Sequence, residues 1–437
     1  DMDGFIDNQG NFGADGIVGP HHEKEGSYYT IKQLWSPVQV MNIAIDRNFD
    51  GKLSVENRYD YLNLNTCRFI WQQVKFPSVT DASNTTTRIL KQGEVQGSDV
   101  AAHGVGVVDI KTSILPEADA LFLTVIDKNG HELWRWTFPV NKLNQQTEQL
   151  SPLSSRPTYT ETENDLTVKA NKRTFIFSKK DGQLKGVSVD NRKISFANGP
   201  RFIGARRADR SLDQFYNHDD EKAKAKDRTY SEFTDAAVFT KLDVKEEGGN
   251  LVLTANYKLG NLDKAQWTIH PDGMATLDYT YNFSGVVDLM GICFDYPEGQ
   301  VLSKRWLGAG PYRVWQNRIH GTQYDIWEND YNDPIPGETF TYPEFKGYFG
   351  SVSWMSIRTK EGTISLTNET PDSYIGVYQP RDGRDRLLYT LPESGISVLN
   401  VIPPVRNKVN STDLCGPSSQ PKWVDGPQTG RLVLRFE

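Results

Sequence analysis

The sequence predicts a mainly β protein made of antiparallel β-sandwiches, and three observations carry that prediction. Segments in which apolar and polar residues alternate recur along most of the 437 residues, as they do in half-buried strands. One short segment near the N-terminus has helical spacing, and after it the pattern changes period. Aromatic residues make up 11% of the chain, which suits sandwich cores and also surfaces that stack on sugar rings. At this length we expect two or three domains.

The N-terminal segment, residues 1–36, is predicted to be a loop followed by one short helix. The loop is rich in Asp, Asn and Gly, as active-site loops are, and it has neither an initiator Met nor a basic and apolar leader. We therefore expect the sequence to begin inside a longer protein. In the helix, Ser27 is the predicted N-cap, Ile31 and Trp35 recur at helical spacing, and Pro37 ends the helix.

Residues 37–143 are predicted to form one immunoglobulin-like β-sandwich. Strand signals recur there about every ten residues, over a length close to the roughly 100 residues of such a domain. The clearest strand pair flanks a turn at Lys128-Asn129-Gly130, after which Trp134, Trp136 and Phe138 alternate with polar residues. We expect one face of this second strand to be buried.

Residues 144–160 are predicted to be a linker, because they are polar, contain two prolines and lack periodicity. Residues 161–437 are predicted to form a large antiparallel β-supersandwich. The absence of a convincing helical pattern there leaves one oversized sandwich or two stacked ones as the alternatives. The charged insert at 208–233 is predicted to be a long surface loop between strands.

Individual strands in this second half follow from the period-2 pattern. Residues 251–259 alternate apolar and polar side chains up to Leu259, and residues 277–283 do the same. A hairpin is predicted over 354–368, with its turn at Glu361-Gly362.

Composition bears on the partners of the chain. The formal net charge is −7 with both signs mixed throughout, so neither nucleic acid nor an anionic membrane is an expected partner. No apolar run approaches the roughly 20 residues that span a bilayer, so we expect a soluble protein, with the compartment, periplasmic or cytoplasmic, left open. Cys67, Cys293 and Cys415 lie far apart without CxxC spacing, so neither a disulfide framework nor a zinc site is expected.

Two stretches that resemble metal sites have simpler interpretations. Residues 46–57, DRNFDGKLSVEN, match four positions of a calcium-binding EF-hand loop, but their flanks have strand patterns where helices are required. We therefore favour a hairpin turn. His21 and His22 are adjacent, and adjacent residues cannot share a ligand face as an i, i+4 pair can, so a solvated loop is favoured. No metal ligand is predicted.

Motifs for other chemistries are weak. The sequence contains no GxSxG, no P-loop and no GxGxxG leading into a helix, so serine nucleophiles and nucleotide binding have no support. Glycoside hydrolysis needs two carboxylates about 5 to 9.5 Å apart, and a sequence does not reveal such a pair on sandwich loops. Trp315, Trp327 and Tyr331 lie in one aromatic-rich stretch that could face a sugar ring, although core packing is the commoner fate.

Several stretches together resemble one family, the glycoside hydrolase family 2 β-galactosidases. NFGADGIVGPHHEKEGSYYTIKQLWSPVQV resembles the end of their catalytic barrel, and DGKLSVENRYDYLNLNTCRFIWQQ resembles the start of the immunoglobulin-like domain that follows. KRTFIFSKKDGQLKGV and RWLGAGPYRVWQNR are similar to parts of the large C-terminal sandwich. The resemblance implies a short (β/α)8 barrel remnant at 1–36, the immunoglobulin-like sandwich at 37–143 and a galactose-mutarotase-like supersandwich at 161–437.

The same resemblance implies where chemistry and binding reside. The family retains configuration through a Glu nucleophile and a Glu acid/base on earlier barrel strands, so no catalytic residue is expected in this chain. Phe12 and Asp15 match positions that help form the sugar pocket and, in some members, a monovalent cation site, although Asp15 stands where the best-known members have Asn. Some members cap the sugar with a Trp from the last sandwich, and the nearest positions here are Cys415 and Trp423. These four residues are the candidate substrate-binding residues.

The resulting hypothesis is a C-terminal, non-catalytic portion of a β-galactosidase-like retaining hydrolase that acts on β-galactosides in carbohydrate degradation. It would buttress the barrel and shape the pocket rim. No cofactor is expected in this chain. The parent enzyme is expected to bind a β-galactoside or related glycan, to use a monovalent cation or Mg²⁺, and to form a homo-oligomer. The alternative is a stand-alone carbohydrate-binding β-sandwich protein without hydrolase activity, which would use exposed aromatic side chains.

Overall fold

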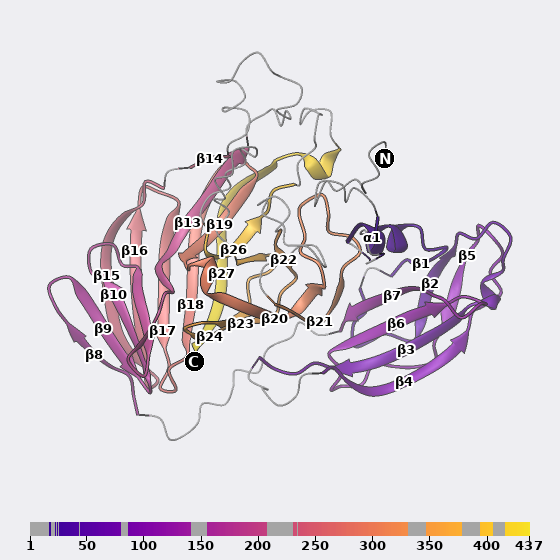
Figure 1. Cartoon of the computed structure of the whole chain (residues 1–437), viewed down its shortest axis with the longest axis horizontal. Coiled ribbons are helices and arrows are strands. Elements are labelled where there is room, and N and C mark those ends of the chain that lie inside the picture. The colour runs from indigo at the N-terminus through magenta and orange to yellow at the C-terminus, as the bar shows by residue number, and fades with distance from the viewer. Residues whose placement is uncertain are drawn as a thin grey trace, which may run out of the picture.

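The computed structural model describes residues 17–18, 22, 24, 26–42, 44–79, 86–140, 155–207, 230–233, 235–330, 347–377, 394–404 and 416–437. Nearly all regular structure in these ranges is strand, and the strands pair antiparallel in four sheets (Figure 1). The predicted mainly β class is therefore confirmed. The α-helix in the described ranges is α1 (Gly26–Leu34), and no helix there is long and apolar enough to cross a membrane.

Two sheets from the first part of the chain face each other across one core. The 3-stranded sheet has the order β1 (Val38–Val40), β2 (Lys52–Asn57), β5 (Val105–Asp109), and the 4-stranded sheet has the order β4 (Arg88–Gln96), β3 (Arg68–Lys75), β6 (Ala120–Ile126), β7 (Glu132–Pro139). Leu53 from the first sheet and Phe69 from the second are fully buried in that core. The EF-hand-like stretch leads into β2, which pairs with β1, so the hairpin interpretation is confirmed.

The remaining two sheets form one large sandwich, which fills the left and centre of Figure 1. The 11-stranded sheet has the order β22 (Phe349–Gly350), β25 (Tyr374–Val377), β26 (Ile396–Val401), β19 (Leu289–Asp295), β13 (Ala197–Arg207), β11 (Leu184–Val189), β10 (Arg173–Ser178), β9 (Asp165–Ala170), β8 (Thr158–Glu161), with β12 (Arg192–Ile194) beside β11 and β14 (Tyr230–Glu232) beside β13. The 9-stranded sheet has the order β15 (Val238–Glu247), β16 (Asn250–Lys258), β17 (Leu262–Ile269), β18 (Ala275–Val287), β27 (Lys422–Phe436), β24 (Gly362–Asn368), β23 (Trp354–Thr359), β20 (Val301–Gly310), β21 (Gln323–Asp330).

The core between these two sheets combines aliphatic side chains with many aromatic ones. Phe177 on β10 meets Trp267 on β17 edge to face, with ring centroids 5.9 Å apart, so side chains of opposite sheets interdigitate. Of the two alternatives for the second half, one oversized sandwich is the one that forms. Strand β8 begins at Thr158, within the residues predicted to be the linker.

The period-2 pattern predicted that these strands exist more accurately than it predicted where they end. The alternation over 251–257 is confirmed, but Leu259 is 82% exposed, because the chain has left β16 and adopts φ 69° there. The hairpin over 354–368 turns one residue earlier than predicted, since Gly362 already pairs with Thr359. Ser27 lies inside α1, which begins at Gly26, so its predicted N-cap position is wrong. Residues 208–229 of the predicted surface loop lie outside the described residues.

The two sandwiches pack against each other through β6, β7 and the end of β3 with the residues that follow it in the smaller one. Phe76 and Phe122 share a small buried cluster with Leu307 and Trp354 of the large sandwich. The Trp354 indole nitrogen donates to the carbonyl of Pro77 at 3.2 Å. The strand predicted to bury one face is therefore part of a sheet that is partly covered on both faces.

Candidate functional site

Trp423 is the one candidate binding residue that lies in the described part of the chain. It stands near the start of β27, opposite Val286 of β18, and 68% of it is exposed. An exposed indole offers an apolar face and a donor N–H, which is the combination that sugar rings stack on. Phe12, Asp15 and Cys415 lie outside the described residues.

The two described tryptophans of the aromatic-rich stretch, Trp315 and Trp327, pack in the protein core and do not form an exposed sugar-binding face. Trp315 is 4% exposed and packs edge to face against Tyr348, with ring centroids 5.4 Å apart. Trp327 is partly buried against the large core, and its indole nitrogen donates to the carbonyl of Gln323. Tyr331 lies outside the described residues. Core packing, the commoner fate, is confirmed for the two tryptophans.

The connection between β20 and β21, residues 311–322, holds the segment that leads into Trp423. The side-chain amide of Gln316 donates to the carbonyls of Ser418 and Gln420, at 2.9 and 2.6 Å. The Asn317 amide donates to Ser419 Oγ at 3.2 Å. The turn Pro417–Ser419, which directly follows Gly416, is thereby fixed to this connection.

The same connection holds α1. Thr30 Oγ1 donates to the carbonyl of His320 at 2.9 Å, and the Gly321 N–H donates to Gln33 Oε1 at 2.6 Å. The rings of Tyr29 and Tyr312 lie 5.3 Å apart. Since no residue of α1 is buried, these contacts are what dock the helix on the large sandwich.

Gly321 makes this close approach possible. Its φ is 86°, in the left-handed region that favours glycine, and a Cβ there would lie 2.5 Å from the backbone nitrogen of Thr30. We refer to residues 311–322, which hold α1 on one side and the turn Pro417–Ser419 on the other, as the clasp loop.

The three segments that the clasp loop brings together contain no carboxylate, although a carboxylate of another segment lies beside them: Glu132 accepts from Lys32 of α1 at 2.7 Å. The segments 26–34, 311–322 and 416–423 contain no Asp or Glu, so they supply neither a nucleophile nor a general acid of the carboxylate type. They do carry hydroxyl, amide and cationic groups. Within the described ranges, no cluster of three or more His, Cys, Asp or Glu residues could hold a metal ion.

Comparison with protein families decides the membership of the chain. Residues 169–399, more than half of the sequence, match the family described as beta galactosidase small chain. The chain belongs to the beta-galactosidase small chain family. The matched range runs from β9 to β26 and contains the clasp loop, whereas α1, the smaller sandwich and β27 with Trp423 lie outside it.

Comparisons with individual proteins add little for this family member. No curated protein matches the chain. Among solved structures, a galactose 1-epimerase from Lactobacillus acidophilus NCFM is 9% identical over 65% of this chain and 99% of its own, with a TM-score of 0.34. HI1317 is 9% identical over 66% and 98%, with a TM-score of 0.29, and a putative mutarotase, YeaD, from Salmonella typhimurium is 11% identical over 66% and 95%, with a TM-score of 0.30. At these scores the likenesses say nothing about function.

The clasp loop was not found from the sequence. The stretch RWLGAGPYRVWQNR carried the family resemblance, but no pattern in it singled out Gln316 as the residue that holds the 417–419 turn. A turn at Gly321 could be predicted from the sequence, because glycine is common in turns. The contact of Gly321 with α1 could not be predicted, because Thr30 and His320 are 290 residues apart in the sequence.

Proposed function

We propose that this chain is the C-terminal, non-catalytic portion of a family 2 β-galactosidase that hydrolyses β-galactosides with retention of configuration. The family match over residues 169–399 carries this proposal, and the description of the family as a small chain agrees with a part that works beside a larger one. The lack of Asp and Glu in residues 26–34, 311–322 and 416–423 agrees with a non-catalytic role for these three segments.

In the parent enzyme, the reaction would proceed in two displacements through a covalent glycosyl intermediate. Both glutamates would belong to the barrel, of which residues 1–36 would be the last part. The smaller sandwich would be the immunoglobulin-like domain, and residues 161–437 the supersandwich. A monovalent cation or Mg²⁺ and a homo-oligomeric state would be properties of that parent.

The contribution of this chain would be to position the rim of the sugar pocket. The clasp loop fixes α1, which follows Phe12 and Asp15 in the sequence, and it also fixes the turn next to Cys415. The described segments nearest in sequence to these candidate residues, α1 and the turn Pro417–Ser419, are thus attached to one loop of the large sandwich. Trp423 would supply a stacking face at the same surface.

Hydrolysis of a panel of nitrophenyl β-glycosides tests the proposal. The chain alone should give no turnover, and addition of the barrel-containing part of the enzyme should produce turnover with the β-galactoside. Turnover by the chain alone that survives repurification would refute the non-catalytic role. Saturable sugar binding without any gain of activity on mixing would favour the stand-alone carbohydrate-binding protein.

A further inference from the structure

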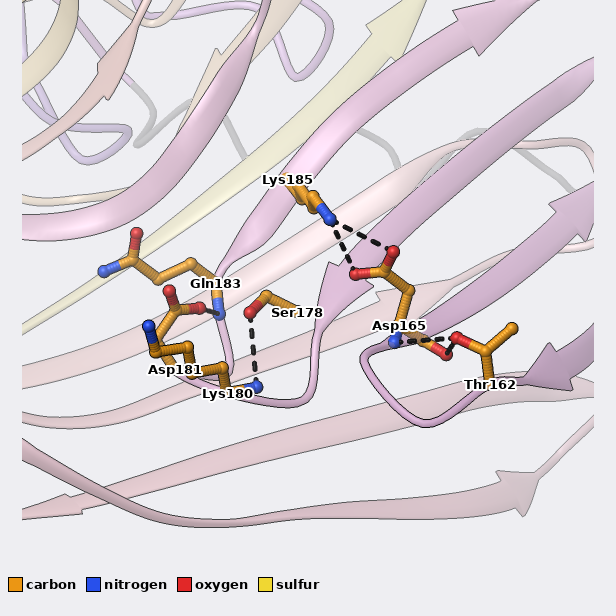
Figure 2. Close-up of polar contacts among 7 residues, drawn as sticks. All are labelled: Thr162, Asp165, Ser178, Lys180, Asp181, Gln183 and Lys185. Atoms are coloured by element: carbon orange, nitrogen blue, oxygen red, sulfur yellow. Dashed lines mark hydrogen bonds and ion pairs between the residues drawn. The ribbon is translucent and has the colours of Figure 1, made fainter.

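A polar hollow lies at the end of the large sandwich that is far from α1 (Figures 1 and 2). It forms where the β8–β9 turn, the β10–β11 turn and the start of β13 come together. Its volume is about 320 Å³, at the lower end of the range of roughly 300 to 1,000 Å³ for ligand sites. All eight residues that line it are polar, and none is aromatic.

The walls of the hollow are held in place by bonds within and between the turns. The backbone N–H of Lys179 donates to the carbonyl of Asn164 at 2.8 Å, which ties the β10–β11 turn to the β8–β9 turn. The Tyr257 hydroxyl donates to the carbonyl of Asp181 at 2.9 Å, and Asp181 Oδ1 accepts from the N–H of Gln183 at 3.1 Å. The hollow is therefore largely formed before any ligand arrives, which lowers the entropic cost of binding.

Some polar groups of the hollow are paired within the protein, and others, of which Asn164 and Lys180 belong to exposed residues, have no protein partner. Asp165 is paired with Lys185 Nζ at 2.9 and 3.1 Å, as Figure 2 shows. Among the described residues, by contrast, the side-chain amide of Asn164, the ammonium of Lys180 and Oδ2 of Asp181 have no hydrogen-bond partner. The hollow thus presents a cationic donor, an anionic acceptor and an amide that does both.

The charges of the lining balance. Lys180 and Lys185 offset Asp165 and Asp181, so an anionic ligand would meet two carboxylates and a cationic ligand two ammonium groups. A neutral molecule with several hydroxyl groups, each able to donate and accept, matches this surface better than either ion.

We propose that this hollow is a second carbohydrate site, which binds a neutral sugar unit through the free groups of Asn164, Lys180 and Asp181. Sugar hydroxyls donate to Asp181 Oδ2 and accept from the Lys180 ammonium. Since no aromatic face contributes stacking, binding is by hydrogen bonds alone and its dissociation constant is millimolar. The site is remote from Trp423 and holds a longer glycan on the enzyme without taking part in hydrolysis. The proposal does not depend on the role of the clasp loop.

Saturation-transfer NMR with galactose, galacturonate and galactosamine tests this site on the full chain. Galactose should give a saturable signal, and its dissociation constant should rise about tenfold or more in Lys180→Ala and in Asn164→Ala. Because neither side chain has a partner among the described residues, both variants should unfold at the same urea concentration as the original chain. Lys169→Ala, on the exposed side of β9 but outside the hollow, is the matched control and should bind normally.

Trp423→Ala separates the two surfaces. Galactose binding that survives in this variant but weakens in Lys180→Ala supports the hollow. The proposal is overturned if galactose gives no saturable signal, if the signal is lost only in Trp423→Ala, or if galacturonate or galactosamine binds more tightly than galactose. None of these outcomes alters the hydrolysis test of the proposed function.

Discussion

Replacement of Gly321 by Ala should release α1 from the clasp loop. The substitution places a Cβ 2.5 Å from the Thr30 nitrogen, and the neighbouring atom is backbone, which has little room to move. Gly130→Ala is a matched control, because Gly130 has nearly the same φ, 88° against 86°, and has nothing within 4 Å of the added Cβ. Both variants carry the same left-handed penalty of about 1–2 kcal/mol, so their difference isolates the contact with α1.

The size of that difference follows from the contacts that hold the helix. Displacement of α1 loses the hydrogen bonds Thr30–His320 and Gly321–Gln33, worth about 1 kcal/mol each. It also loses the Tyr29–Tyr312 ring contact, worth about 0.5–1.5 kcal/mol. The docking free energy should therefore fall by about 2.5–3.5 kcal/mol, which corresponds to roughly 60- to 300-fold in an equilibrium constant.

Native-state hydrogen exchange of the α1 amides measures this change. Their protection should fall by the same factor in Gly321→Ala and stay unchanged in Gly130→Ala, while the amides of the large core keep their protection in both. If α1 is equally protected in the two variants, the helix is held by something other than the clasp loop, and the argument for a positioned pocket rim fails with it.

Two further predictions concern the sandwiches themselves. Asp325→Ala should lower the free energy of unfolding by about 2 kcal/mol, because the half-buried Asp325 carboxylate accepts from Arg135 at 2.9 Å across the junction between the two sandwiches. Glu94→Ala, which removes an exposed ion pair with Arg68, should lower it by less than about 1 kcal/mol. Equal losses of stability in urea unfolding would contradict this prediction. Burial lowers the pKa of His270 below 6.5, so the unfolded chain binds more protons there, and stability should fall as pH drops below that value. His270→Gln should reduce this loss of stability below about pH 6.5, and an unchanged pH profile of urea unfolding would count against it.

The strands were predictable from the sequence because a strand that is buried on one face has apolar residues at every second position. Tyr279 and Tyr281 illustrate this, since both are buried as their alternation predicts, although one of the two strands that pair with theirs, β27, is far away in the sequence. Ends of elements were less predictable. Leu259 looks like the next inward residue by period, but the chain leaves the sheet one residue earlier, and only the pairing partners of β16 decide where that happens.

The arrangement around the clasp loop was not predictable, for a different physical reason. A helix that buries an apolar stripe shows in its sequence which face packs against the protein. In contrast, α1 has no buried residue and is held mainly by polar contacts to backbone groups. Since every residue has such backbone groups, the sequence does not indicate which of them the helix contacts. Such docking is weaker than core packing and depends on the geometry of one glycine and two side chains. The clasp loop holds α1 on the large sandwich, so under the proposed function changes in the clasp loop should alter the sugar affinity of the assembled enzyme while the core of either sandwich stays intact.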